Sequence, residues 1–196
     1  MTASTTALAP VPRQYIAKQA MFSFLGNTFR LYDRSGQLQF FVKQKAFKLK
    51  EEINLFGDEA QTQKKMVIKA RSISDFSGGY DILDAETGEV IGAGQRQGVR
   101  SMFKDEWDIL DADGAVCGKV VETGGALAVL RRFIKILRWI PQKYEVSYMG
   151  EPVGTIHQHF NPFQLAYDVH FQEGTDFDPR LGVGMVVLLL AIEGRG

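Results

Sequence analysis

The chain is poor in the features that usually reveal a function at first sight. Cys117 is the only cysteine among 196 residues, so no intrachain disulfide can form and no thiolate cluster can hold a metal. Basic and acidic residues are equal in number, 23 each, and this balance disfavours a generic nucleic-acid binder. The N-terminus has no basic stretch followed by an apolar one. Together these features predict a cytoplasmic protein.

Motifs for nucleotide binding and nucleophilic catalysis are also missing from the sequence. There is no P-loop and no G-x-S-x-G elbow. Gly92, Gly94 and Gly98 do not have the dinucleotide-binding spacing, and such glycines more often mark bends in strands. Cys117 has no histidine near it in the sequence. We therefore expect no cofactor, no catalytic residues and no enzymatic activity.

No apolar run is long enough to cross a bilayer. The longest, Leu181 to Ile192, has 12 residues, whereas a spanning helix needs roughly 20. Asp178 can cap a helix here while Pro179 takes its first position. Such a helix, at about residues 179–193, has no polar face and must be buried on every side. The run therefore predicts a barrel, or a thick layered core, that encloses its own C-terminal helix.

Hairpin signals are abundant. Segments with two β-type runs around a turn, most of them with Asp and Gly in the turn, lie at residues 29–42, 52–70, 80–93, 107–121, 144–158 and 153–171. Asp and Gly tolerate the backbone angles that tight turns need. Many short strands at regular spacing favour a β-sandwich or a β-barrel. Residues 1–13 are small, polar and Pro-containing, which predicts a loose tail before a single domain at 14–196.

A second helix is predicted near residues 126–140, where the β rhythm stops. Apolar residues fill one half of its helical circle and basic residues the other half, and Pro141 ends it. No acidic residue lies between Thr123 and Tyr144, so this segment carries +5 and the rest of the chain carries −5. The basic residues are Arg131, Arg132, Lys135, Arg138 and Lys143.

This basic helix has two interpretations, and both stay open. It can lie on an anionic membrane surface, where each well-placed base adds about 1 kcal/mol. It can instead cover the barrel or a partner with its apolar face while water solvates its charges. The two also combine if the apolar face packs and the basic face meets lipid.

Metal binding is not expected from the histidines or from the acidic turns. His157 and His159 share a face if they lie on a strand, but a third ligand is needed. His170 is predicted to pair near Val153, away from His157. Asp111 to Gly114 lacks the spaced oxygen ligands and closing Glu of a calcium loop, and is predicted to be a hairpin turn.

Three stretches resemble a known superfamily. They are FRLYDRSGQLQFFVKQKAFKLKEEINLFG, MVIKARSISDFSGGYDILDAETGEVIGA and DPRLGVGMVVLLLAI. They look like the LURP-one-related, phospholipid scramblase and tubby C-terminal proteins, and the resemblance covers about residues 14–193. It implies a mainly β fold, a closed antiparallel barrel of about twelve strands around a hydrophobic C-terminal helix.

The resemblance also implies a function at membranes. Tubby-like members bind phosphoinositides through basic residues on the barrel wall, and Lys69 and Arg71 look similar because positions two apart on a strand face the same side. The cysteine-rich and Pro-rich segments of scramblases have no counterpart here, so lipid scrambling is not expected. We expect a non-enzymatic barrel that binds anionic phospholipid or phosphoinositide headgroups. The alternative is a structural or protein-interaction domain, such as a homodimer, with no lipid role.

Overall fold

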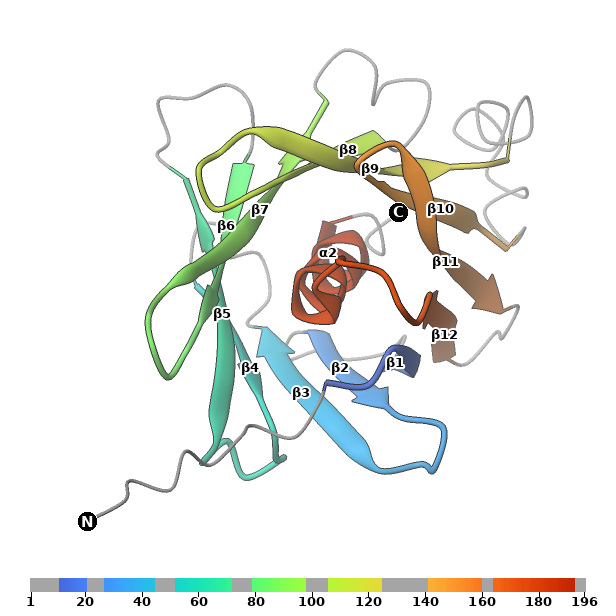
Figure 1. The fold of residues 1–196 in the computed structure, drawn as a ribbon. Coiled ribbons are helices and arrows are strands. Elements are labelled where there is room, and N and C mark those ends of the chain that lie inside the picture. The colour runs from blue at the N-terminus through green and yellow to red at the C-terminus, as the bar shows by residue number, and fades with distance from the viewer. Residues whose placement is uncertain are drawn as a thin grey trace.

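The computed structural model describes residues 11–20, 27–44, 52–71, 79–97, 106–124, 141–159 and 164–192. Within these residues, twelve antiparallel strands close into one barrel, and a single helix follows them (Figure 1). The elements are β1 (Gln14–Ala20), β2 (Asn27–Tyr32), β3 (Leu38–Gln44), β4 (Ile53–Phe56), β5 (Lys64–Ala70), β6 (Gly79–Asp84), β7 (Val90–Arg96), β8 (Glu106–Leu110), β9 (Val116–Glu122), β10 (Lys143–Tyr148), β11 (Glu151–His159), β12 (Gln164–Phe171) and α2 (Pro179–Ile192).

Each strand pairs with the next one along the chain, and the ring closes where β1 pairs with β12. In that last ladder Gln14 lies opposite His170 and Gln19 lies opposite Leu165. Every described strand therefore has a neighbour on both sides, which protects its edge hydrogen-bonding groups. The prediction of a closed antiparallel barrel is confirmed.

Aspartates organise the hairpin turns. Asp33, Asp58, Asp84 and Asp111 each end or follow a strand and accept hydrogen bonds from backbone N–H groups of the turn that comes next. The six predicted hairpins are present, and Asp111 belongs to a turn as expected. These carboxylates compensate turn N–H groups that no strand partner can reach.

We expect the folding stability to decrease as the pH falls below about 4. Burial favours the neutral form of Asp84, but N–H groups of Thr87 and Glu86 and the Arg180 guanidinium outweigh it and lower its pKa. A carboxyl with a lowered pKa stabilises the fold above its unfolded-state pKa, and that contribution disappears as the pH falls through the folded value. Melting temperatures measured between pH 7 and pH 3 should therefore fall less steeply in Asp84→Asn than in the native chain. Equal slopes in Asp84→Asn and the native chain would contradict the prediction.

Helix α2 begins as its sequence predicts. The Asp178 carboxylate accepts a hydrogen bond from the backbone N–H of Arg180 at 2.8 Å, which caps the helix, and Pro179 is the first helical residue. Arg180 also links the helix start to a hairpin, because its guanidinium donates to Asp84 at 2.9 Å and to Asp178 at 2.7 Å. These bonds fix the place where the helix starts relative to β6.

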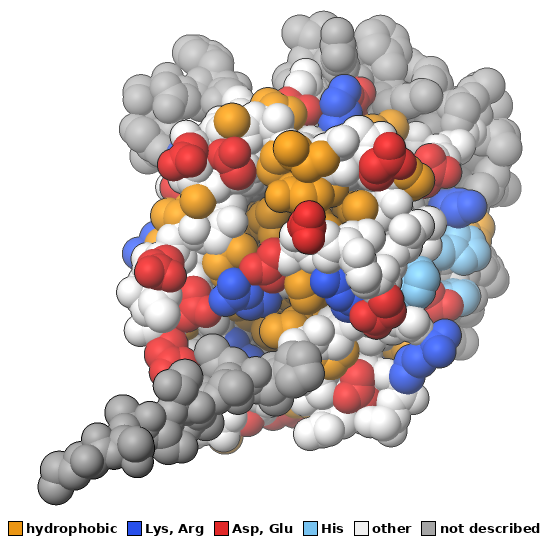
Figure 2. Space-filling model, viewed as in Figure 1, with side chains coloured by type: hydrophobic (Ala, Val, Ile, Leu, Met, Phe, Trp, Pro, Cys, Tyr) orange, Lys and Arg blue, Asp and Glu red, His pale blue; other side chains and the backbone are white. Residues whose placement is uncertain are grey.

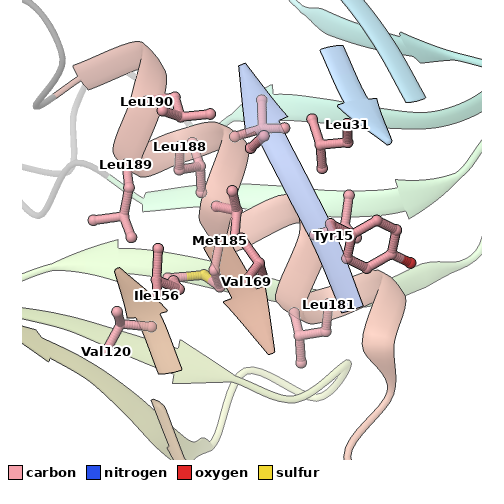
Figure 3. Close-up of a cluster of buried hydrophobic side chains, with 14 of the residues drawn as sticks. Tyr15, Leu31, Val120, Ile156, Val169, Leu181, Met185, Leu188, Leu189 and Leu190 are labelled. Atoms are coloured by element: carbon pink, nitrogen blue, oxygen red, sulfur yellow. The ribbon is translucent and has the colours of Figure 1, made fainter. Parts of the chain in front are cut away.

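Every residue of α2 from Leu181 to Ala191 is buried. The helix contacts β2, β7 and β12, and in Figure 1 strands surround it in projection. Figure 3 shows Leu181, Met185 and Leu188 among side chains of several strands. Glycines allow close approach: a Cβ on Gly94 of β7 would lie 2.7 Å from the Met185 sulfur, and one on Gly182 would lie 2.3 Å from the Phe171 ring.

The helix expected at 126–140 and the tail expected at 1–13 lie wholly or largely outside the described residues. The amphipathic helix expected at 126–140, with Arg131, Arg132, Lys135 and Arg138, lies outside the described residues. The tail was predicted to extend to residue 13, but Arg13 is bound: its Nη1 donates to the Gln172 carbonyl at 2.8 Å and to Thr175 Oγ1 at 3.2 Å. Through these hydrogen bonds Arg13, which directly precedes β1, contacts the segment between β12 and α2.

Candidate functional site

A row of side chains crosses the outer wall from β10 to β1. Lys143 lies opposite His157, His157 lies opposite Asp168, and Asp168 lies opposite Ile16. All four are exposed, while the residues next to them, such as Tyr144 and Ile156, point inward and are buried. This alternation is what a strand with one face on the core produces.

More titratable groups adjoin this row. His159 Nε2 lies 2.6 Å from Asp168 Oδ2, and the rings of His157 and His159 are 5.4 Å apart. His159 and Lys18 share the same neighbour on β12, Ala166. We call Lys18, Lys143, His157, His159 and His170 the basic wall, and histidine side chains of this wall are visible in pale blue in Figure 2. It continues, at Lys143, the basic segment that the sequence singled out.

In the part of the chain that the structure describes, no three His, Cys, Asp or Glu side chains are arranged to hold a metal ion. The predicted pairing of His170 near Val153 is wrong by two positions, since His170 lies opposite Thr155. The partner of His157 is still Asp168, so His170 is not directly opposite it.

The basic residues of the wall differ in how far their charge is compensated. Lys143 is exposed and, among the described residues, has no acidic partner. Lys18 lies with its Nζ 5.4 Å from the ring centroid of Tyr32, a cation–π contact that keeps its charge. The sequence patterns did not single out Lys18, because the strand that carries it, β1, adjoins no hairpin signal.

Lys69 and Arg71, the positions that look similar to the tubby basic residues, are placed elsewhere. Lys69 Nζ lies 3.0 Å from Glu52 Oε1, and Arg71 Nε lies 2.6 Å from Asp81 Oδ1. Both bases are therefore compensated by acids from adjacent segments. β5 is separated from β10 by four strands on one side of the ring and by more on the other. The structure does not bring Lys69 and Arg71 together with Lys143.

Comparison with known proteins places this arrangement in a family. A model of LURP-one-related proteins matches residues 38–190, most of the chain. The protein belongs to the LURP-one-related family. A crystal structure of an Arabidopsis thaliana protein is similar, with a TM-score of 0.50 and 14% identity over 91% of this chain and 92% of that chain. At this identity the likeness shows a common fold only. No curated protein matched the chain.

The family match covers the basic wall only in part. It includes β10, β11 and β12, but β1 and β2 precede Leu38, so Lys18 lies outside the matched region of this LURP-one-related barrel. Among the described residues, no helix has the length and apolar character needed to cross a bilayer.

Proposed function

We propose that this LURP-one-related barrel is a non-enzymatic, peripheral membrane module of the cytoplasm that binds anionic phospholipid headgroups, phosphoinositides among them. In this proposal α2 fills the barrel interior, which leaves the outer surface for binding. The continuous burial of Leu181 to Ala191 and the close approach of Gly94 and Gly182 to their neighbours support that placement of the helix. A tightly filled interior leaves little space for a substrate.

The observation that carries the proposal is that Lys143 has no acidic partner among the described residues. It ends a basic segment that carries +5, and it stands beside His157 on the exposed basic wall. Near an anionic leaflet each basic residue contributes about 1 kcal/mol to the binding free energy, and the contributions of the five basic residues in this segment add together. Lys69 and Arg71 contribute less, because their partners Glu52 and Asp81 offset their charges.

We expect the native chain to co-sediment with vesicles of phosphatidylcholine and phosphatidylserine, and more with vesicles that also contain a phosphoinositide. It should not co-sediment with phosphatidylcholine alone. Reversing Arg131, Arg132 and Lys135 to Glu should abolish binding, and Lys143→Glu should weaken it about fivefold or more, the effect of losing roughly 1 kcal/mol. Raising the salt concentration to about 0.5 M should release the protein, because screening shortens the range of surface electrostatics.

Lys119→Glu is the matched control. Lys119 is a half-exposed lysine on β9 that already pairs with Glu106 at 3.7 Å. This variant should bind vesicles as the native chain does. Equal binding to neutral and anionic vesicles, or none to either, would rule out the proposed function.

The alternative, a protein-interaction domain with no lipid role, is favoured by two exposed apolar residues. Val116 is 59% exposed and Met149 is 74% exposed, both at the end of the barrel where the tight turns lie. If a stable homodimer buries Val116 and Met149, sedimentation equilibrium will show a dimer whose formation is lost in Met149→Asn.

A further inference from the structure

Met149 occupies a backbone conformation that does not suit a methionine. It and Gly150 form the two-residue turn between β10 and β11, with φ of 51° and 88°. Turns with two positive φ angles favour Asn-Gly, since Asn and Gly tolerate the left-handed region. Another residue there costs roughly 1 kcal/mol. Folding stability alone does not explain a methionine at this position, and such strain points to a role for the side chain.

The Met149 side chain is 74% exposed, and Val116, which is 59% exposed, lies on the neighbouring strand β9. The backbone N–H of Met149 donates to the Cys117 carbonyl at 2.7 Å, which brings Met149 beside Val116. Tyr148 packs with its ring 5.5 Å from the ring of Phe177, which is fully buried and gives the surface a rigid base. We call Val116, Cys117, Tyr148 and Met149 the methionine patch. Methionine is flexible and polarisable, properties that suit contact with apolar partners of varied shape.

Acidic residues border the methionine patch. Asp111, Asp113, Glu151 and Asp176 form this acidic rim, and none of them pairs with a basic side chain within the described ranges. Burial raises the pKa of Tyr148, and Cys117, Asp111 and Asp176 add to the effect, so these acids lie within electrostatic reach of the patch.

We propose that the methionine patch docks a basic amphipathic segment of a partner protein, whose apolar side chains cover Met149 and Val116 while its Lys and Arg residues meet the acidic rim. An anionic membrane does not fit this surface, because four carboxylates with no basic partner among the described residues would repel it. β10 places the patch at one end and Lys143 at the other, about 17 Å apart along the strand. The inference is thus independent of the proposed lipid binding.

The probe is a fluorescein-labelled amphipathic peptide of about 15 leucine and lysine residues, titrated with the full chain and followed by anisotropy. Met149→Asn should weaken binding at least tenfold and, because it relieves the turn, raise the melting temperature by about 2–4 °C. Val116→Thr should weaken binding a few-fold. The double variant Asp113→Asn, Glu151→Gln should weaken binding and reduce its salt dependence.

Two controls separate docking from general stickiness. Ile16→Thr removes an apolar residue that is 38% exposed on β1, away from the patch, and should leave binding unchanged. A peptide of leucine and glutamate should not bind. Undiminished binding by Met149→Asn, or equal binding of the two peptides, would overturn the inference.

Other occupants of the patch would give different results. If Met149→Asn weakens co-sedimentation with anionic vesicles, the patch is a membrane contact and the inference is wrong. If the native chain self-associates and Met149→Asn does not, the occupant is a second copy of this chain and not a separate partner. Absence of any binding to the leucine–lysine peptide also overturns the inference.

Discussion

A chain that stops at Asp178 does not fold into a barrel. Removing α2 takes away eight large apolar side chains that are at most 5% exposed in the native fold, from Leu181 to Leu190. Burying each contributes at least about 1.5 kcal/mol, so the helix supplies about 12 kcal/mol. This equals the whole folding stability of a typical domain, about 5–15 kcal/mol. The inward faces of the strands would also lose the surface against which they pack.

The test of this truncation is spectroscopic. Trp107 is fully buried, so its near-ultraviolet circular dichroism signal reports the packed core. The truncated chain should lack that signal and show no cooperative urea transition, while a chain without residues 2–10 keeps both. A cooperative transition in the truncated chain would show that the strands form a stable barrel without the helix.

Gly182→Ala destabilises the fold by about 2 kcal/mol or more, although alanine is the better helix former by about 1 kcal/mol. The added Cβ would lie 2.3 Å from the ring of Phe171, which is fully buried and cannot swing into solvent. Either the ring or the helix has to shift, and a close-packed interior resists both. Urea unfolding at neutral pH measures the change directly.

Gly57→Ala is the matched control, because there a Cβ would also meet a neighbour at 2.6 Å, the Lys65 Cε. That atom belongs to an exposed lysine and moves away easily, so the variant should stay within about 0.5 kcal/mol of the native chain. Combining Gly182→Ala with Phe171→Leu should recover part of the loss, since the smaller side chain leaves room. Simple additivity of the two losses would show that the ring is not the obstacle.

The hairpins could be predicted from the sequence because their information is local. Asp33 and Asp111 stand at the heads of turns whose hydrogen bonds run over two to four residues. β1 could not be predicted in this way. Its sequence, QYIAKQA, adjoins no recognisable turn, and its ladder with β12 joins residues far apart in the chain. The register of His170 depends on the connection between β11 and β12, which a sequence pattern does not define.

The candidate sites divide in the same way, into residues that a local sequence signal reveals and residues whose surroundings depend on strand pairing. Lys143 was found because an acid-free stretch is visible in the sequence. The compensation of Lys69 and Arg71 was not visible, since Glu52 and Asp81 reach them only through strand pairing. The strain at Met149 is visible only in the structure, because any residue can precede glycine and the sequence does not show the sign of φ.

Closure of the ring by β1 and β12 determines when the protein can fold during synthesis. Gln14 cannot meet His170 until the ribosome has added about 150 further residues, which takes roughly ten seconds or more at cellular rates. Until then β1 has an open edge, and the apolar inner faces of the early strands stay uncovered until α2, which follows all twelve strands, has been translated. Contacts this distant also make folding slow. The nascent chain therefore depends on chaperones or on rapid late collapse to avoid aggregation. In the folded barrel this hazard is gone, because β1 and β12 are paired.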